Sequence, residues 1–137
     1  MRMQKVVPFL MFNGQAEEAV DFYTTIFRNS QIISMDKYGE DGPGVAGTVN
    51  HSIFTLNNQQ FMALDNANGT DVPFTPAMSF AVNCDSEEEI DYLFARLSTN
   101  GKVMMDLVPM EPVARKFAWV EDRFGVSWQL NLPSFGE

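Results

Sequence analysis

Most of the chain consists of short runs in which apolar and polar residues alternate, and two longer stretches carry apolar residues three to four positions apart. Alternation predicts β-strands with one buried face, and the longer period predicts amphipathic helices. Two helices are expected, at about Ala16–Phe27 and Glu87–Leu97, and Asn100-Gly101 ends the second. Eight strands are expected, at about Val6–Phe12, Gln31–Tyr38, Val45–Leu56, Gln59–Asp65, Met78–Asn83, Lys102–Leu107, Val113–Glu121 and Val126–Leu132.

The segment around the first helix is repeated around the second. Val82–Tyr92 aligns with Phe12–Phe22 without a gap, at a constant offset of 70 positions. Apolar partners keep the same helical face, and the identical pairs are Asn13/Asn83, Glu17/Glu87, Glu18/Glu88 and Asp21/Asp91. Identities together with a preserved period indicate two related halves rather than chance.

Each half has the same order of elements, which is a strand, a helix and three further strands. The predicted fold class is therefore α+β, a tandem pair of βαβββ units in a single domain over residues 1–137. The first unit covers residues 1–65 and the second covers residues 77–132. Residues 66–76, NANGTDVPFTP, are rich in turn formers and form the expected linker.

Charge and composition narrow the classes of partner. Nine Lys and Arg are scattered among eighteen Asp and Glu, which gives a formal net charge of −9. Nucleic acids and anionic membrane surfaces both need clustered cations, so neither is an expected partner. No apolar run approaches the roughly 18 residues that span a bilayer.

The start, MRMQKVVPFLMF, lacks a long apolar core and a small-residue cleavage site, so a first strand is expected rather than a signal peptide. The single cysteine, Cys84, cannot form an internal disulfide, which predicts a reducing cytoplasm.

Several motifs resemble one superfamily. The βαβββ repeat, the segment AEEAVDFYTTIF and the closing hairpin VEDRFGVSWQL, with its D-x-x-G turn, resemble the vicinal oxygen chelate superfamily of glyoxalases, extradiol dioxygenases and bleomycin-resistance proteins. PFLMFNGQAEEAVDFYTTIF, NNQQFMALD and the strand of Trp128 resemble its PhnB-like branch more closely, whose members are often labelled demethylubiquinone methyltransferase-like. The resemblance covers nearly the whole chain. It implies a cupped mixed sheet with helices outside and a cleft inside. It also implies a homodimer, paired side by side or by exchanged units, and long strands with edges that need covering favour the same state.

The resemblance also says where a metal would be held. In metal-dependent members the ligands come from the first and last strand of each unit, and the place of the final ligand, a Glu, matches Gln129. The first strand here contains no His, Glu or Asp, and its counterpart in the second half offers only Ser79. The last strand of the first unit offers Met62, or Asp65 at its end. Divalent metals in such enzymes need several convergent imidazoles and carboxylates, so neither a metal nor another cofactor is expected.

The closing strand places an amide beside the predicted cleft. Alternation puts Ser127, Gln129 and Asn131 on one face and the apolar residues Val126, Trp128, Leu130 and Leu132 on the other, and the resemblance implies that the first face borders the cleft and the second the helices. The Gln129 amide offers two donors and an acceptor, which can fix a polar ligand group without charge. The other candidates for ligand contact are Ser79, Met62, Asp65, Phe9 and Trp119.

The lone histidine, His51, lies on the long third strand, with Val49 and Ile53 expected on its own side. One interpretation is that His51 is a half-buried strand residue whose imidazole hydrogen-bonds to a neighbouring group. The other is a catalytic residue of the cleft that exchanges a proton near pH 7. His51 has no obvious carboxylate partner in the local sequence, and Asp65, on the next strand, is a candidate partner in space.

Three functional hypotheses remain, and the sequence leaves open whether the protein is an enzyme. The leading one is a small-molecule-binding protein that holds a modest, partly apolar organic ligand without metal, and sequesters it or acts on it through His51. The second is a metal-dependent lyase or dioxygenase of the vicinal oxygen chelate type. The third is a non-catalytic interaction module whose cleft is filled by its own side chains. The methyltransferase label has no support, because the glycine cluster Gly39–Gly44 joins two strands rather than a strand and a helix.

Overall fold

The structure is a computed structural model and describes residues 2–134. The predicted domain limits at residues 1 and 137 therefore lie outside the described residues. The chain divides into two compact units between Pro73 and Phe74, a point inside the predicted linker of residues 66–76.

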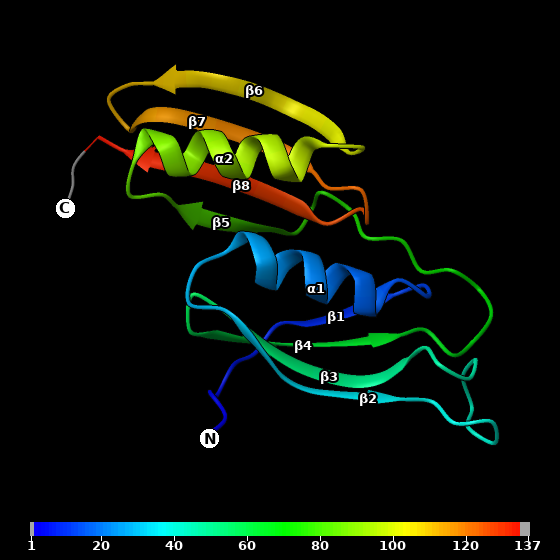
Figure 1. Cartoon of the computed structure of the whole chain (residues 1–137). Helices are drawn as coiled ribbons and strands as arrows, with labels where there is room; N and C mark the ends of the chain where they lie inside the picture. Colours follow the sequence, from blue (N-terminus) through cyan, green and yellow to red (C-terminus); the bar gives the residue numbers. More distant parts are fainter. Residues whose placement is uncertain (1, 135–137) are drawn as a thin grey trace. The chain divides into compact units, whose positions relative to one another are not determined.

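Unit 1 is a four-stranded mixed sheet with one helix on one of its faces (Figure 1). Its elements are β1 (Phe9–Phe12), α1 (Ala16–Ile26), β2 (Gln31–Lys37), β3 (Val49–Leu56) and β4 (Gln59–Asp65). The strand order is β1-β4-β3-β2, in which β1 is parallel to β4 and the other neighbours are antiparallel. α1 contacts β2, β3 and β4 through an apolar stripe, which consists of Ala19, Val20, Tyr23 and Ile26.

Unit 2 repeats this design (Figure 1). Its elements are β5 (Ser79–Asn83), α2 (Glu87–Ser98), β6 (Lys102–Met110), β7 (Ala114–Glu121) and β8 (Ser127–Pro133). The strand order is β5-β8-β7-β6, and β5 is again parallel to β8. The predicted α+β fold with two βαβββ units is therefore confirmed.

Local chemistry explains where α2 begins and which face it buries. The Ser86 hydroxyl accepts a hydrogen bond from the backbone N–H of Glu89 at 3.1 Å, which satisfies one free N–H of the first turn. Ile90, Leu93 and Leu97 are buried on the helix side of the unit 2 sheet. The apolar residues predicted to face this helix, Val126, Trp128, Leu130 and Leu132, are all at most 3% exposed. The predicted core face of the closing strand is therefore confirmed.

β5, β7 and β8 begin one residue later than the alternation predicts, and β1 and β3 begin at least three residues later. β1 starts at Phe9 rather than Val6, because Pro8 has no N–H to donate to the ladder, and Val6 is exposed. β3 starts at Val49 rather than Val45, because residues 45–48 form a turn. In that turn the backbone N–H of Thr48 donates to the Val45 carbonyl at 3.1 Å, and the Thr48 hydroxyl donates to the same carbonyl at 2.7 Å.

Neither α1 nor α2 is long and apolar enough to cross a membrane, and residues 2–134 contain no other α-helix.

Candidate functional site

In unit 1 the sheet face opposite α1 carries partly exposed side chains. This face, called here the open face of unit 1, consists of Phe9, Met11, His51, Ile53, Met62 and Leu64. Phe9 is 49% exposed, and the other five are half-buried. The rings of Phe9 and His51 meet edge to face, with their centroids 5.8 Å apart and an interplanar angle of 87°. The imidazole is therefore held against apolar groups while part of it remains accessible.

Val49 does not share this face with His51, and that part of the prediction is wrong. Asp36 pairs with His51, but the next residue, Lys37, pairs with Val49, so β3 carries one extra residue, Asn50, in a bulge. The Lys37 ammonium lies 3.0 Å from the Glu17 carboxylate of α1, which places this end of the pair on the helix side. A bulge shifts the alternation by one position, and Val49 is fully buried as a result.

Asp65 also lies on the helix side, where its carboxylate binds backbone. Oδ1 accepts hydrogen bonds from the N–H groups of Gly14 at 2.8 Å and Ala16 at 3.0 Å, and Oδ2 accepts one from Val49 at 2.9 Å. These bonds tie the start of α1 to the start of β3. The side chains of Asp65 and His51 therefore leave opposite faces of the sheet, and the predicted pairing between them is wrong.

Asp36 is the acidic residue that the register places across from His51. The two are direct Cα partners in the antiparallel β2–β3 pair, so their side chains leave the same face. The sequence alone did not identify Asp36, because its position opposite His51 depends on the bulge at Asn50.

In unit 2 the face opposite α2 carries neutral hydrogen-bonding groups. Ser79, Asn83, Trp119, Ser127, Gln129 and Asn131 share this open face of unit 2, which also carries the apolar Ala81 and Phe117 and the Glu121 carboxylate. The Gln129 amide donates from Nε2 to the Ser79 hydroxyl at 3.1 Å. Trp119 lies directly across from Gln129, and its Nε1 donates to the Ser127 hydroxyl at 2.7 Å. Asn131 donates from Nδ2 to Oδ1 of Asn83 at 3.0 Å.

Part of the hydrogen-bonding capacity of this face is unused. Within residues 2–134, Gln129 makes one side-chain hydrogen bond, which leaves its Oε1 acceptor and one N–H donor. The Ser79 hydroxyl accepts from Gln129, and its own hydrogen donates to no described residue. Together with the half-buried Trp119 ring, these atoms can bind a planar polar group that carries no charge.

The residues present do not fit a resident divalent metal ion. No group of three or more His, Cys, Asp or Glu able to hold a metal occurs within residues 2–134. On the open face of unit 1, the His51 ring packs against Phe9, and the Asp36 carboxylate lies across the β2–β3 pair. On that of unit 2, the polar groups are amides, hydroxyls, an indole and one carboxylate, that of Glu121. Within the described residues, neither face gathers the three or more imidazoles and carboxylates that such metals need.

Cys84, just after β5, is buried and chemically quiet. Burial, with the Glu89 carboxylate nearby, raises the pKa of the Cys84 thiol to about 12. Because only the thiolate is a strong nucleophile or metal ligand, Cys84 fits neither role near neutral pH.

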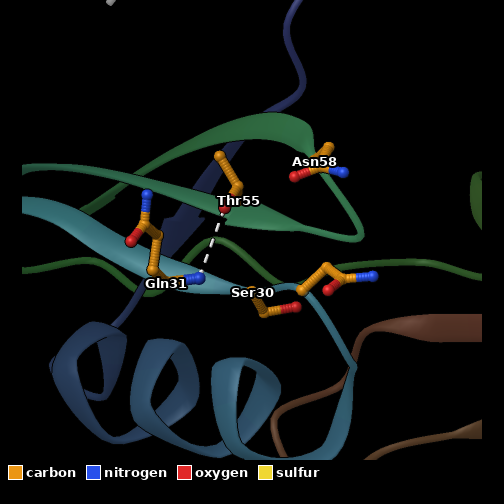
Figure 2. Close-up of a pocket in the computed structure, with 5 residues that line it drawn as sticks. Ser30, Gln31, Thr55 and Asn58 are labelled. Atoms are coloured by element: carbon orange, nitrogen blue, oxygen red, sulfur yellow. Dashed lines mark hydrogen bonds between the residues drawn. The ribbon is translucent and has the colours of Figure 1, made fainter.

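A polar pocket at one end of the unit 1 sheet was not predicted. It has a volume of about 260 Å³ and is lined by Asn29, Ser30, Gln31, Thr55 and Asn58. Figure 2 shows these residues around the point where the chain enters β2 and where β3 turns into β4. Asn57-Asn58 was predicted only as a tight turn, and nothing in the alternation pattern brings Asn29 close to it.

The sequence matches the family described as 3-demethylubiquinone-9 3-methyltransferase over residues 4–131. The chain belongs to this family. It is similar to the PhnB protein from Bacillus cereus, with 50% identity and a TM-score of 0.90, over 94% of this chain and 99% of that chain. It is also similar to protein PA1353 from Pseudomonas aeruginosa, with 30% identity and a TM-score of 0.82, over 96% of this chain and 98% of that chain. No curated protein matches the sequence.

More distant structures share the fold that the motifs predict. The fosfomycin resistance protein FosX from Listeria monocytogenes shares the fold, with a TM-score of 0.66 and 11% identity, over 96% of this chain and 95% of that chain. At that identity the likeness shows the fold alone.

The predicted site residues of this PhnB-like chain fall into three groups. His51, Phe9 and Met62 share the open face of unit 1. Gln129, Ser79 and Trp119 share the open face of unit 2. Asp65 belongs to neither face, because its carboxylate is bound to backbone on the helix side.

Proposed function

We propose that this PhnB-like protein binds a small, partly apolar organic molecule on an open sheet face, without a resident metal ion. The observation that carries the proposal is the Gln129–Ser79 hydrogen bond beside Trp119. It stands at the place where metal-dependent relatives in the superfamily carry a Glu. A neutral amide bonded to a hydroxyl favours a polar organic group over a cation.

The open face of unit 1, taken by itself, offers apolar contacts and a titratable group to such a molecule. Phe9 and Met62 are direct partners in the β1–β4 pair and offer partly exposed apolar surface, and His51 is the titratable group that packs against Phe9. An imidazole in this position can hydrogen bond to a ligand oxygen, or it can move a proton if the protein acts on the molecule. Both sequestration and acid–base catalysis are compatible with this arrangement.

Metal content and bound ligand test the proposal directly. Elemental analysis of protein purified without chelators should find no stoichiometric Mn, Fe, Ni or Zn. Native mass spectrometry of the same sample, followed by denaturation and extraction, should identify any co-purified organic molecule. A stoichiometric metal would favour the lyase or dioxygenase alternative. Failure of wild-type protein to bind any member of a library of small neutral aromatic and amide compounds would favour a non-catalytic interaction module.

This proposal does not include methyl transfer, although the name of the family refers to it. A glycine-rich loop between a strand and a helix commonly holds the nucleotide part of a methyl donor. Here the β1–α1 loop contains only Gly14, the β5–α2 loop contains no glycine, and Gly39–Gly44 joins β2 to β3. Incubation with S-adenosylmethionine should leave the melting curve of the protein unchanged, because these loops lack the glycines that would hold the nucleotide part of the methyl donor.

We also propose a cytoplasmic homodimer. Each sheet ends in strands with a free edge, β1 and β2 in unit 1 and β5 and β6 in unit 2. A second copy of the chain would cover apolar residues at these edges. The single, buried thiol of Cys84 suits a reducing compartment.

A further inference from the structure

The polar pocket of unit 1 lies on the same sheet face as His51. Gln31 and Thr55 are Cα partners in the β2–β3 pair, so their side chains leave one face together. Thr55 follows Ile53 and His51 at alternate positions on β3, which puts it on their side of the sheet. Four residues along a strand correspond to about 13 Å, so the pocket and His51 are separate places on one face.

Hydrogen-bonding groups gather around this pocket, and none of them is charged (Figure 2). The lining contains three amide side chains, Asn29, Gln31 and Asn58, and two hydroxyls, Ser30 and Thr55. None of the three side-chain amides makes a hydrogen bond to another residue within the described part of the chain. Each amide therefore keeps two donors and an acceptor for a partner in the pocket.

Thr55 adds a donor that protein atoms leave unused. Its side chain is only 6% exposed, and its Oγ1 accepts a hydrogen bond from the backbone N–H of Gln31 at 3.3 Å. Within residues 2–134 the Thr55 hydroxyl hydrogen donates to no other group. Buried hydroxyls in proteins are normally satisfied as donors as well as acceptors, which points to a partner that enters from the pocket.

The backbone around the pocket is fixed in place rather than loosely arranged. The N–H of Asn58 donates to the Asn29 carbonyl at 3.2 Å, and the Asn58 carbonyl accepts from the Gln4 side chain at 3.0 Å. Asn29 and Asn58 both adopt left-handed backbone conformations, with φ of 53° and 67°. Asparagine tolerates this region better than most residues, so the two amides are presented from rigid turns.

We infer that this pocket is a second binding site, which takes a small uncharged polyhydroxyl compound. Each hydroxyl of such a ligand both donates and accepts, which matches amide and hydroxyl side chains that also do both. An ion would lose its hydration without gaining an opposite charge, because the lining carries none. A volume of about 260 Å³ is near the lower end for ligand sites, which limits the compound to the size of a small polyol or a monosaccharide.

Side-chain amide NMR signals test the inference on the full chain. Glycerol and glucose are titrated into ¹⁵N-labelled protein, with acetate and ammonium as charged comparison compounds. We expect saturable shifts of the Asn29, Gln31 and Asn58 NH₂ signals with glucose, at a dissociation constant on the order of millimolar. Glycerol should shift the same signals more weakly, and the charged compounds should not saturate.

Three variants separate this site from its surroundings. Gln31→Ala, at an exposed position, should weaken glucose binding about fivefold, as expected for the loss of about one hydrogen bond. Thr55→Val should weaken it further. Asn68→Ala, an exposed amide outside the pocket, is the matched control and should change nothing.

His51→Ala should also leave glucose binding unchanged, so failure of this inference and failure of the proposed function can be told apart. The inference is overturned if the shifts stay linear with concentration, if acetate or ammonium saturates the same signals, or if Gln31→Ala binds glucose as wild type does.

Discussion

At the scale of single residues, the neutral pair Gln129–Ser79 occupies the position where the superfamily resemblance implies a charged ligand. Within residues 2–134 the amide keeps an acceptor and a donor free, and Trp119 flanks it across the β7–β8 pair. A cation gains little from these groups, whereas a neutral polar group gains hydrogen bonds in a half-buried place. Binding at this position therefore depends on hydrogen bonds rather than on charge.

Gln129→Glu tests whether a single carboxylate is enough for a metal site. We expect no tight site in the variant, because within residues 2–134 no cluster of imidazoles and carboxylates exists for the new group to join. Elemental analysis and melting curves with added Mn, Fe, Ni and Zn should match those of wild type. Stoichiometric metal in either protein would contradict the metal-free proposal. The variant should fold, because the Ser79 hydroxyl can donate to the new carboxylate.

His51 should matter to ligand binding more than to folding. Its ring is half-buried and packs against Phe9, which is itself 49% exposed. His51→Ala should therefore change the free energy of unfolding by no more than about 1 kcal/mol, measured by urea denaturation. A loss of several kcal/mol would return His51 to a purely structural role.

The thiol of Cys84 should resist alkylation in the folded protein. Burial is the largest cause that raises its pKa to about 12 from an ordinary 9.0, so almost no thiolate exists at pH 8. Iodoacetamide should label Cys84 rapidly only in denaturant, as mass spectrometry can follow. Because the unfolded chain ionises first, this thiol should favour the folded state below about pH 9, and its contribution should fall as the pH rises from about 9 to 12. Equal labelling rates with and without denaturant would contradict the buried position.

At the scale of elements, Asp65 joins three segments of unit 1. Its carboxylate accepts from Gly14 and Ala16 at the start of α1 and from Val49 at the start of β3, while it ends β4 itself. Its backbone carbonyl accepts a hydrogen bond from the Tyr38 hydroxyl at 3.3 Å. One residue thus fixes the helix to the sheet at the point where the loop of residues 38–48 returns.

Asp65→Ala should therefore destabilise the protein strongly. The substitution leaves three backbone N–H groups without their acceptor, and the expected cost is about 3 kcal/mol or more. Asp36→Asn is the matched control, since Asp36 is exposed and makes no side-chain hydrogen bond within the described residues. It should stay within about 0.5 kcal/mol of wild type in urea denaturation. Similar losses for the two variants would show that the Asp65 network is not needed for stability.

The alternation pattern predicted these elements well where packing is regular and failed where it is not. β4 occupies its expected residues, and α1 and α2 end within one residue of theirs, because each buries one continuous apolar face. The bulge at Asn50 could not be predicted, since an extra residue in a strand leaves no mark on a local pattern. The role of Asp65 was missed for a related reason, because its partners lie 16 to 51 positions away along the chain.

At the scale of the whole molecule, the repeat and its motifs were enough to predict the fold, but they predicted the candidate sites only in part. A repeat at constant offset specifies two units of the same topology, which is what both sheets have. The alternation of side chains between the two faces of a strand then places Gln129 and His51 on the open faces. The pocket at Asn29 and Asn58 depends on left-handed turns that come together only in three dimensions, so no sequence period reports it.

The last prediction concerns assembly. β2 exposes Ile32 and Ile33, and β6 exposes Val103 and Met105, each between 36% and 45%. Both strands are sheet edges, and exposed apolar edges invite pairing unless a partner covers them. Light scattering at micromolar concentration should give twice the chain mass of 15.4 kDa. Ile33→Lys and Val103→Lys place a charge on one edge each, and the edge that forms the dimer should be the one whose variant dissociates. A monomeric mass for wild type would sink the proposal. A dimer that survives both substitutions would move the interface to β1, β5 or the open faces.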